Sequence, residues 1–130
     1  MSKIEKGLYY TKEHEWVRIE GDTATVGVTD HAQEALGDIT YIDLPEPGDK
    51  VNQFDALLAV ESTKAASDVF APVGGEVAEV NEALDDRPEL VNQDPYGKGW
   101  MVKLKGVDAS QTGQLMDSDA YAAFEQGDNA

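Results

Sequence analysis

The chain has 130 residues, 41% of them hydrophobic, which is enough for one folded domain with its own core. It carries 26 acidic and 10 basic residues, and the net charge of −16 disfavours nucleic-acid and anionic-membrane partners. Cysteine is absent, which excludes disulfides, thiolate metal ligands and a cysteine nucleophile. We predict a single domain over residues 1–130. The interpretation of the acidity stays open between solubility, or adaptation to a salty cytoplasm, and steering toward basic faces of partners.

No segment has the roughly 18 consecutive apolar residues that a membrane-spanning helix needs, so no membrane partner is expected. Met1–Gly7 lacks both the apolar region of a secretory signal and an arginine-rich mitochondrial leader. We therefore expect a cytoplasmic protein of bacterial type, with a mature mitochondrial form as the alternative.

The amino-terminal part of the chain is dominated by strand signals separated by turn residues. The predicted strands are Tyr9–Tyr10, Trp16–Ile19, Thr23–Val28 and Ile39–Leu44. Thr29 or Asp30 can cap a short helix before the last of these strands, and Gly37 is placed to end it. The buried side of this helix is expected to consist of Ala32, Ala35 and Leu36.

A hairpin with one lysine near its turn follows. Leu57–Val60 is a short apolar run, Val69 and Phe70 begin a second one, and Lys64 lies between the two. The small residues around the turn leave the lysine accessible at an exposed tip. A lysine in isolation is usually an ordinary solvated side chain, so Lys64 gains significance only from the string that surrounds it.

The remainder of the chain is predicted to hold two more strands and several short helices. Glu76–Val80 alternates as a strand does, and Asn81–Gly99 has few apolar residues, which indicates a surface excursion with one helical turn. Trp100–Leu104 is the final strand, with Trp100, Val102 and Leu104 expected to face the core. Ser110–Gln126 has a helical pattern that Asp117 and Ser118 interrupt, so two short helices are expected there.

The string Glu61–Asp68, followed by Ala71–Val77, resembles the lipoyl-attachment segment of the glycine cleavage system H-protein family. Other segments resemble the same family in the expected order, over about residues 8–126, which we take as the core of the domain. They are Tyr10–Trp16, Gly27–Gln33, Gly37–Asp38, Asp43–Gly48, Asn81–Leu84, Pro88–Asn92, Pro95–Tyr96 and Gly99–Trp100.

The resemblance implies a fold and a function. The fold is mainly β with short helices: a lipoyl/biotinyl-type barrel-sandwich hybrid of two facing antiparallel sheets, with the lipoyl lysine on a hairpin turn and helices at the C-terminus. The implied cofactor is lipoate, joined covalently to Lys64 through an amide, and it supplies the sulfur pair that the chain lacks.

The implied role is that of a carrier with no catalytic residues and no metal of its own. The lipoyl-lysine arm would take the aminomethyl group of glycine from a pyridoxal-phosphate glycine dehydrogenase (decarboxylating) to a tetrahydrofolate-dependent aminomethyltransferase. Dihydrolipoyl dehydrogenase would then reoxidise the arm. A lipoate ligase or an octanoyl or lipoyl transferase would attach the cofactor.

The resemblance also assigns expected roles to acids near the arm. Glu61, three residues before Lys64, would be recognised by the lipoylating enzyme. Glu15 and Asp68 would contribute to a site that holds the loaded, cationic arm. The sequence departs from relatives at three positions: Glu13 stands where some members have a small hydroxyl residue, Thr63 where valine is frequent, and Phe54 where many lipoyl-type domains have a glycine before this hairpin.

Several other functions remain as alternatives. An enzyme would have to use His14–Glu15 or Asp30–His31, but neighbouring strand residues diverge, and His31 is expected to be a capping or surface residue of the helix. Biotin carriers have methionines beside the lysine, where this chain has Thr63 and Ala65. Lipoyl domains of 2-oxoacid dehydrogenase complexes typically have an aspartate before the lysine. A lipoyl-relay carrier and an unmodified H-like interaction module are the two remaining alternatives.

Overall fold

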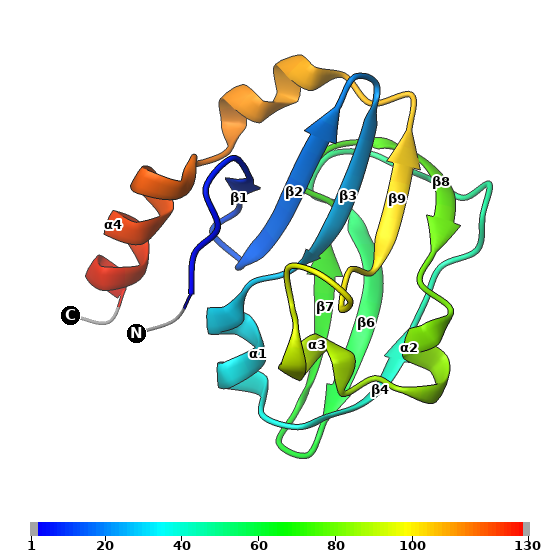
Figure 1. Ribbon diagram of the computed structural model, residues 1–130. Coiled ribbons are helices and arrows are strands. Elements are labelled where there is room, and N and C mark those ends of the chain that lie inside the picture. The colour runs from blue at the N-terminus through cyan, green and yellow to red at the C-terminus, as the bar shows by residue number, and fades with distance from the viewer. Residues whose placement is uncertain (1–2, 129–130) are drawn as a thin grey trace.

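Two antiparallel sheets face each other in the computed structural model, which describes residues 3–128 (Figure 1). The larger sheet has, in spatial order, β1 (Tyr9–Tyr10), β2 (Glu15–Glu20), β3 (Thr23–Val28), β9 (Val102–Lys105), β8 (Gly75–Val80) and β5 (Lys50–Val51). The smaller sheet consists of β4 (Ile39–Asp43), β6 (Ala56–Ser62) and β7 (Ala66–Phe70). This arrangement confirms the predicted two-sheet, mainly β fold.

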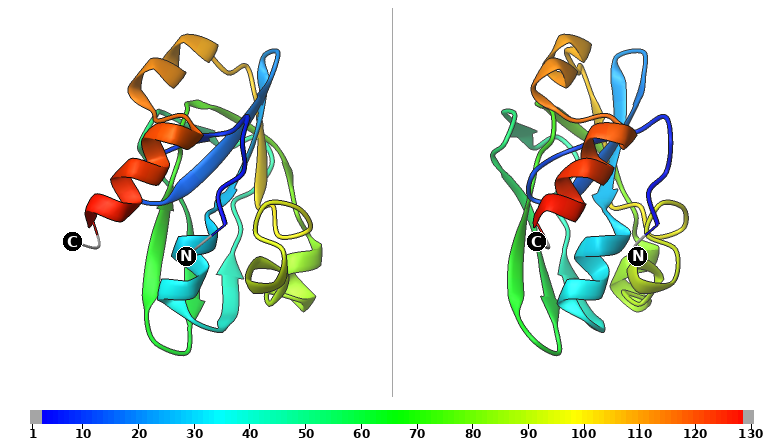
Figure 2. Two further views of the ribbon diagram at one scale, coloured as in Figure 1. Left: turned by 60° about the vertical axis from the view of Figure 1, so that its left-hand side comes forward. Right: turned by 90° about the vertical axis from the view of Figure 1, so that its left-hand side faces the viewer.

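Short helices surround the sheets. They are α1 (Asp30–Leu36), α2 (Ala83–Asp86), α3 (Leu90–Gln93), the 3-10 helix η1 (Ala109–Gln114) and α4 (Ser118–Asp128). The break between η1 and α4 falls at Asp117, which confirms the prediction of two short C-terminal helices. Helix α4 lies beside β1, on the side of the molecule opposite α2 (Figures 1 and 2). Among the helices of residues 3–128, none has the length and apolar character needed to span a bilayer.

The main core fills the space between the sheets with β-branched and leucine side chains. Alternation along the strands places every second residue inward, as with Leu58 and Val60 on β6. A second cluster packs α4 against β1 and β2, and it consists of the buried residues Leu8, Tyr10, Trp16, Tyr96 and Tyr121. Trp16 Nε1 in this cluster donates to the Pro95 carbonyl at 3.0 Å.

The first helix forms largely as expected. The Thr29 hydroxyl accepts from the Ala32 amide at 3.2 Å, and Gly37 ends the helix with φ +77°. Ala32 and Leu36 pack on the core, but the expectation for Ala35 is wrong because this residue is exposed. Gln33 of the same helix contacts α3 instead, since its side-chain oxygen accepts a hydrogen bond from the Asn92 side chain.

Two expectations for the second half of the chain are wrong. The segment 81–99 is no surface excursion, because α2 and α3 bury Leu84, Leu90 and Val91 against the main core. Trp100 precedes the last strand and packs on the second cluster. The Trp100 carbonyl accepts from the Asn81 side chain at 2.7 Å, and the strand itself begins only at Val102.

Candidate functional site

The turn between β6 and β7 is stabilised by its own hydrogen bonds. The Ser62 hydroxyl accepts from the amides of Lys64 (3.2 Å) and Ala65 (3.1 Å), and the Ser62 amide donates to the Ala65 carbonyl at 2.8 Å. The Thr63 amide donates to the Asp38 carbonyl at 3.0 Å, which ties the tip to the end of α1. The turn therefore has a fixed shape, although its side chains face solvent.

Lys64 lies at this tip and is exposed, as predicted. The stem of its side chain rests over Gly37, where an added Cβ would lie 3.2 Å from Lys64 Cε and 3.4 Å from Cδ. The Gly37 carbonyl is held by the Asn92 side chain at 2.9 Å. Gly37 thus both ends α1 in a left-handed conformation and leaves a shallow seat for a long side chain.

The two acids that the sequence singles out on the hairpin are both exposed. Glu61 lies on β6, between Tyr41 of β4 and Ala66 of β7 in the strand register. Asp68 lies on β7, on the same side as Phe70 two residues later. Neither carboxylate forms a salt bridge within residues 3–128, and neither lines the pocket that contains Glu15.

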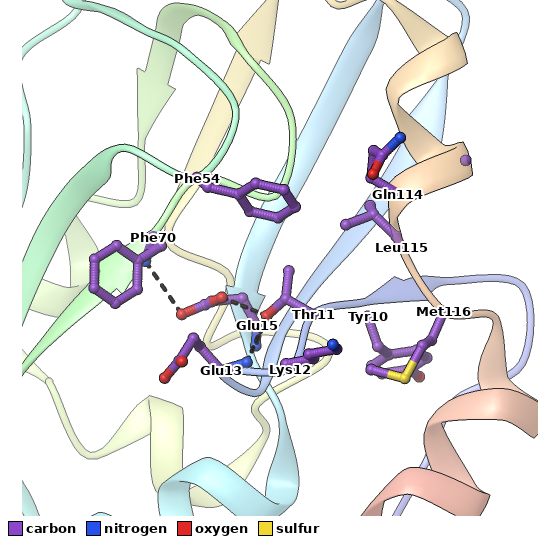
Figure 3. A pocket seen from close by; sticks show the side chains of 11 residues that line it. Tyr10, Thr11, Lys12, Glu13, Glu15, Phe54, Phe70, Gln114, Leu115 and Met116 are labelled. Atoms are coloured by element: carbon purple, nitrogen blue, oxygen red, sulfur yellow. Dashed lines mark hydrogen bonds between the residues drawn. The ribbon is translucent and has the colours of Figure 1, made fainter.

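A pocket of about 620 Å³ opens beside the base of the hairpin (Figure 3). Its walls come from the β1–β2 turn, from the loop before β6, from the end of β7 and from the connection between η1 and α4. The lining residues are Tyr10, Thr11, Lys12, Glu13, Glu15, Phe54, Phe70, Gly113, Gln114, Leu115 and Met116. The pocket thus combines two carboxylates and one ammonium with apolar and aromatic side chains.

Glu15 joins the two sheets at the floor of this pocket. Its side chain is only 2% exposed, one of its oxygens accepts from the Thr11 hydroxyl, and the other accepts from the Phe70 amide at 3.1 Å. Burial raises the pKa of the Glu15 carboxyl to about 7, although both hydrogen bonds favour the ionised form. Glu15 is therefore a carboxyl that changes charge near neutral pH.

His14 directs its ring away from Glu15. The ring stacks on that of His31 with centroids 4.1 Å apart, and its Nδ1 lies 2.7 Å from the Tyr121 hydroxyl. His31 Nδ1 lies 3.7 Å from a Glu125 carboxylate oxygen, so this histidine is half-buried between His14 and α4. The expectation of a capping or surface role for His31 is wrong. His14 and Glu15 engage different partners, as predicted.

Phe54 is a pocket residue whose unusual identity the sequence revealed without explaining it. Its backbone has φ +70°, a left-handed conformation that favours glycine, and the residue is 48% exposed. This conformation accounts for the glycine of many lipoyl-type domains at the same position. No local pattern indicated a pocket role for Thr11 or Phe70, because their places in the pocket depend on contacts between the two sheets.

The chain has two facing sheets and an exposed lysine at the tip of a hairpin whose turn is closed by its own hydrogen bonds. These features are those of a carrier domain of the lipoyl/biotinyl barrel-sandwich class. Within that class, residues 8–128 match the sequence profile described as "Glycine cleavage H-protein". The chain belongs to the glycine cleavage H-protein family.

Relatives from distant bacteria match nearly the whole chain. A glycine cleavage system H protein of Cronobacter sakazakii is 53% identical over 125 residues, which are 95% of this chain and 97% of that protein. One from Thermus thermophilus is 54% identical over 118 residues, 91% of this chain and 92% of the relative. The crystal structure of a glycine cleavage system H protein from Mycobacterium marinum superposes with a TM-score of 0.85 at 37% identity, covering 95% of this chain and 99% of that one.

Proposed function

We propose that this chain works as the lipoyl carrier of a glycine cleavage system with Lys64 as its attachment point. The carrier role in glycine cleavage follows from membership in the family. The observation that supports Lys64 is its position, since it is the only lysine of the β6–β7 hairpin and occupies the exposed tip. We further propose that residues 1–130 act as one domain and that no residue of the chain performs the chemistry.

The surroundings of Lys64 suit an acylated arm. The hydrogen bonds of Ser62 and Thr63 hold the backbone of the tip, so the hairpin can present the lysine rigidly while its side chain stays mobile. The seat over Gly37 accepts a methylene stem, and an amide on Nζ removes the lysine charge. The lipoyl group, once bound, supplies a redox-active sulfur pair that accepts and releases a one-carbon amine unit.

The specific partners belong to the same proposal. We expect the carrier to serve a pyridoxal-phosphate glycine dehydrogenase, a tetrahydrofolate-dependent aminomethyltransferase and dihydrolipoyl dehydrogenase in turn. A ligase or transferase would first attach the lipoyl group and would recognise Glu61, which is exposed three residues from Lys64. Holding one arm near each docked partner raises the effective concentration of the reacting group, and this is what a carrier contributes.

The pocket beside Glu15 is the proposed resting place for the cationic end of the arm. Strand β7 leads from the tip to this pocket, and Phe70 follows Lys64 by six residues, or about 20 Å of extended strand. Asp68 lies between Lys64 and Phe70, so one carboxylate lies along β7 and a second, Glu15, lies in the pocket where the strand ends. A cation near Glu15 favours the ionised form of this carboxyl, and the attraction is strengthened because Glu15 itself is only 2% exposed.

The first test is the intact mass of the protein from a lipoate-supplied host, with peptide mapping. We expect one lipoyl adduct, confined to the peptide that contains Lys64. An exposed lysine away from the hairpin, Lys98, provides the internal control and should remain unmodified. A folded but unmodified protein from a host with active ligase would favour the interaction module, and a biotin adduct would move the chain to the sister class of carriers.

A further inference from the structure

Phe54 combines three properties that are rarely found together. It is a large aromatic residue, it is about half exposed, and its backbone is left-handed. Within residues 3–128, only His14 shares such a positive φ among the non-glycine residues, and His14 lies directly before Glu15. Phe54 lines the pocket, and His14 is the chain neighbour of two lining residues, Glu13 and Glu15. Backbone strain of this kind persists only where the surrounding structure enforces it.

The loop that carries Phe54 is held firmly in place. The Phe54 amide donates to the Ala71 carbonyl at 2.6 Å, and the Gln53 side chain donates to the carbonyls of Pro72 and Gln111, each at 3.0 Å. The hydrogen bond to Gln111 connects this loop to η1, whose last residues and the segment after them form the opposite wall of the pocket. The backbone from which the Phe54 ring extends is thus held to the end of β7 and to η1.

The ring lies where it can cover the pocket. It extends from its loop toward Leu115, across the pocket from Lys12 and Glu13, with Glu15 below (Figure 3). The charged side chains of the pocket are two carboxylates and one ammonium, so the site has an excess of negative charge. An aromatic face above carboxylates is a favourable environment for an organic ammonium group, through cation–π attraction and apolar contact.

We propose that Phe54 is a retention residue: its ring closes the pocket over the ammonium end of the loaded arm and lengthens the time for which the arm stays docked. This inference rests on the proposed function of Lys64. A glycine at this position could adopt the same backbone conformation without strain but would have no side chain to form the cover. The aromatic residue therefore adds a contact to the docked arm without changing the fold of the loop.

The test compares release of the loaded arm from four lipoylated proteins: wild type, Phe54→Gly, Phe54→Tyr and Tyr41→Ala. Tyr41 is the other exposed large hydrophobic residue and does not line the pocket, so it controls for general loss of a surface aromatic. Intact mass first establishes that each protein carries the lipoyl group. The reduced arm is then loaded with formaldehyde and ammonium, which condense with one thiol and lose one water, and release is the reverse hydrolysis.

Two readouts report on docking in the absence of any partner enzyme. The first is the rate of formaldehyde release, which should rise about two- to fivefold in Phe54→Gly, as expected for loss of one cation–π contact, and stay near wild type in the other two variants. The second is the nitrogen–proton NMR signal of the Phe70 amide, which reports on Glu15. It should shift on loading in wild type and shift less in Phe54→Gly.

The outcomes separate this inference from the function on which it rests. A lipoyl adduct on Lys64 with equal release rates in wild type and Phe54→Gly would leave the carrier function standing and overturn the role of Phe54. Equal acceleration by Tyr41→Ala would also overturn it, because the effect would then not come from the pocket. If no protein carried the adduct, both proposals would fall together.

Discussion

The tip and the base of the β6–β7 hairpin lie in opposite surroundings, one exposed and one buried. At the tip, the Ser62 hydroxyl accepts two backbone amides near solvent, and Lys64 reaches outward. At the base, the buried Thr11 hydroxyl accepts the amides of Glu13 (3.2 Å) and Glu15 (3.1 Å) and donates to the Glu15 carboxylate. A side-chain hydroxyl that accepts two backbone amides is therefore found both in the exposed turn at one end and in the buried floor between the two sheets at the other.

This difference separates attachment from docking. The tip depends on local hydrogen bonds and can present its lysine to several enzymes, whereas the base depends on contacts between both sheets. Substitutions at the tip should therefore change modification with little effect on stability. Substitutions at the base should change stability, pH dependence and arm docking together.

The largest expected effect comes from Lys64→Arg at the tip. The variant keeps a positive charge but presents no amine for amide formation, so lipoylation and glycine cleavage should be lost completely. Because the side chain is exposed, the free energy of unfolding should change by no more than about 0.5 kcal/mol. Intact mass, urea unfolding and glycine turnover with the full system are the measurements. The matched variant Lys98→Arg should retain the adduct, and any adduct on Lys64→Arg would refute the assignment.

The next effect concerns Glu15 at the base. Its carboxyl has a pKa of about 7 in the folded chain against 4.5 when unfolded, so the folded state binds the proton more tightly. Stability should be greatest below pH 4.5 as far as this group is concerned, and should fall as the pH rises to 7. The shift corresponds to about 3 kcal/mol in total.

The variant Glu15→Gln isolates this effect because the amide resembles the protonated acid and does not titrate. Urea unfolding of both proteins at pH 5, 6, 7 and 8 is the measurement. The stability of wild type relative to the variant should decline across this range and level off above pH 7. A constant difference would show that Glu15 does not titrate there. Asp68→Asn, an exposed change on β7, serves as the control and should leave the slope unaltered.

The sequence was sufficient for the hairpin, for most of the strands and for a helix cap at Thr29 or Asp30, because each follows from neighbours in the chain. It was insufficient where packing decides. Segment 81–99 has few apolar residues, yet each of Leu84, Leu90 and Val91 finds a place in the core. The stacking of His14 on His31 and the bond from Phe70 to Glu15 join residues far apart in sequence, and no local pattern indicates them.

Thr11→Ala and Ser62→Ala compare the two hydroxyls directly. Loss of the Thr11 hydroxyl removes the acceptor of the Glu13 and Glu15 amides and one of the two hydrogen bonds to the buried Glu15 carboxyl, so the free energy of unfolding should fall by about 1–3 kcal/mol. Water can replace the Ser62 hydroxyl, so this variant should lose less than about 1 kcal/mol and still be lipoylated. Urea unfolding and intact mass measure both. Equal losses would mean that the tip is as dependent on its hydroxyl as the base.

The smallest expected difference lies at Phe54, between two variants that both lack the ring. Phe54→Ala keeps a Cβ in the left-handed conformation, whereas Phe54→Gly removes the strain at φ +70°. Glycine loses more backbone entropy on folding, which offsets part of this gain. The glycine variant should thus be more stable than the alanine variant by about 1 kcal/mol in urea unfolding, a net of these two effects. If alanine were the more stable, the strain at φ +70° would be smaller than the entropy cost of glycine, and the surrounding structure would not have to enforce the left-handed conformation that places the Phe54 ring at the base of the hairpin.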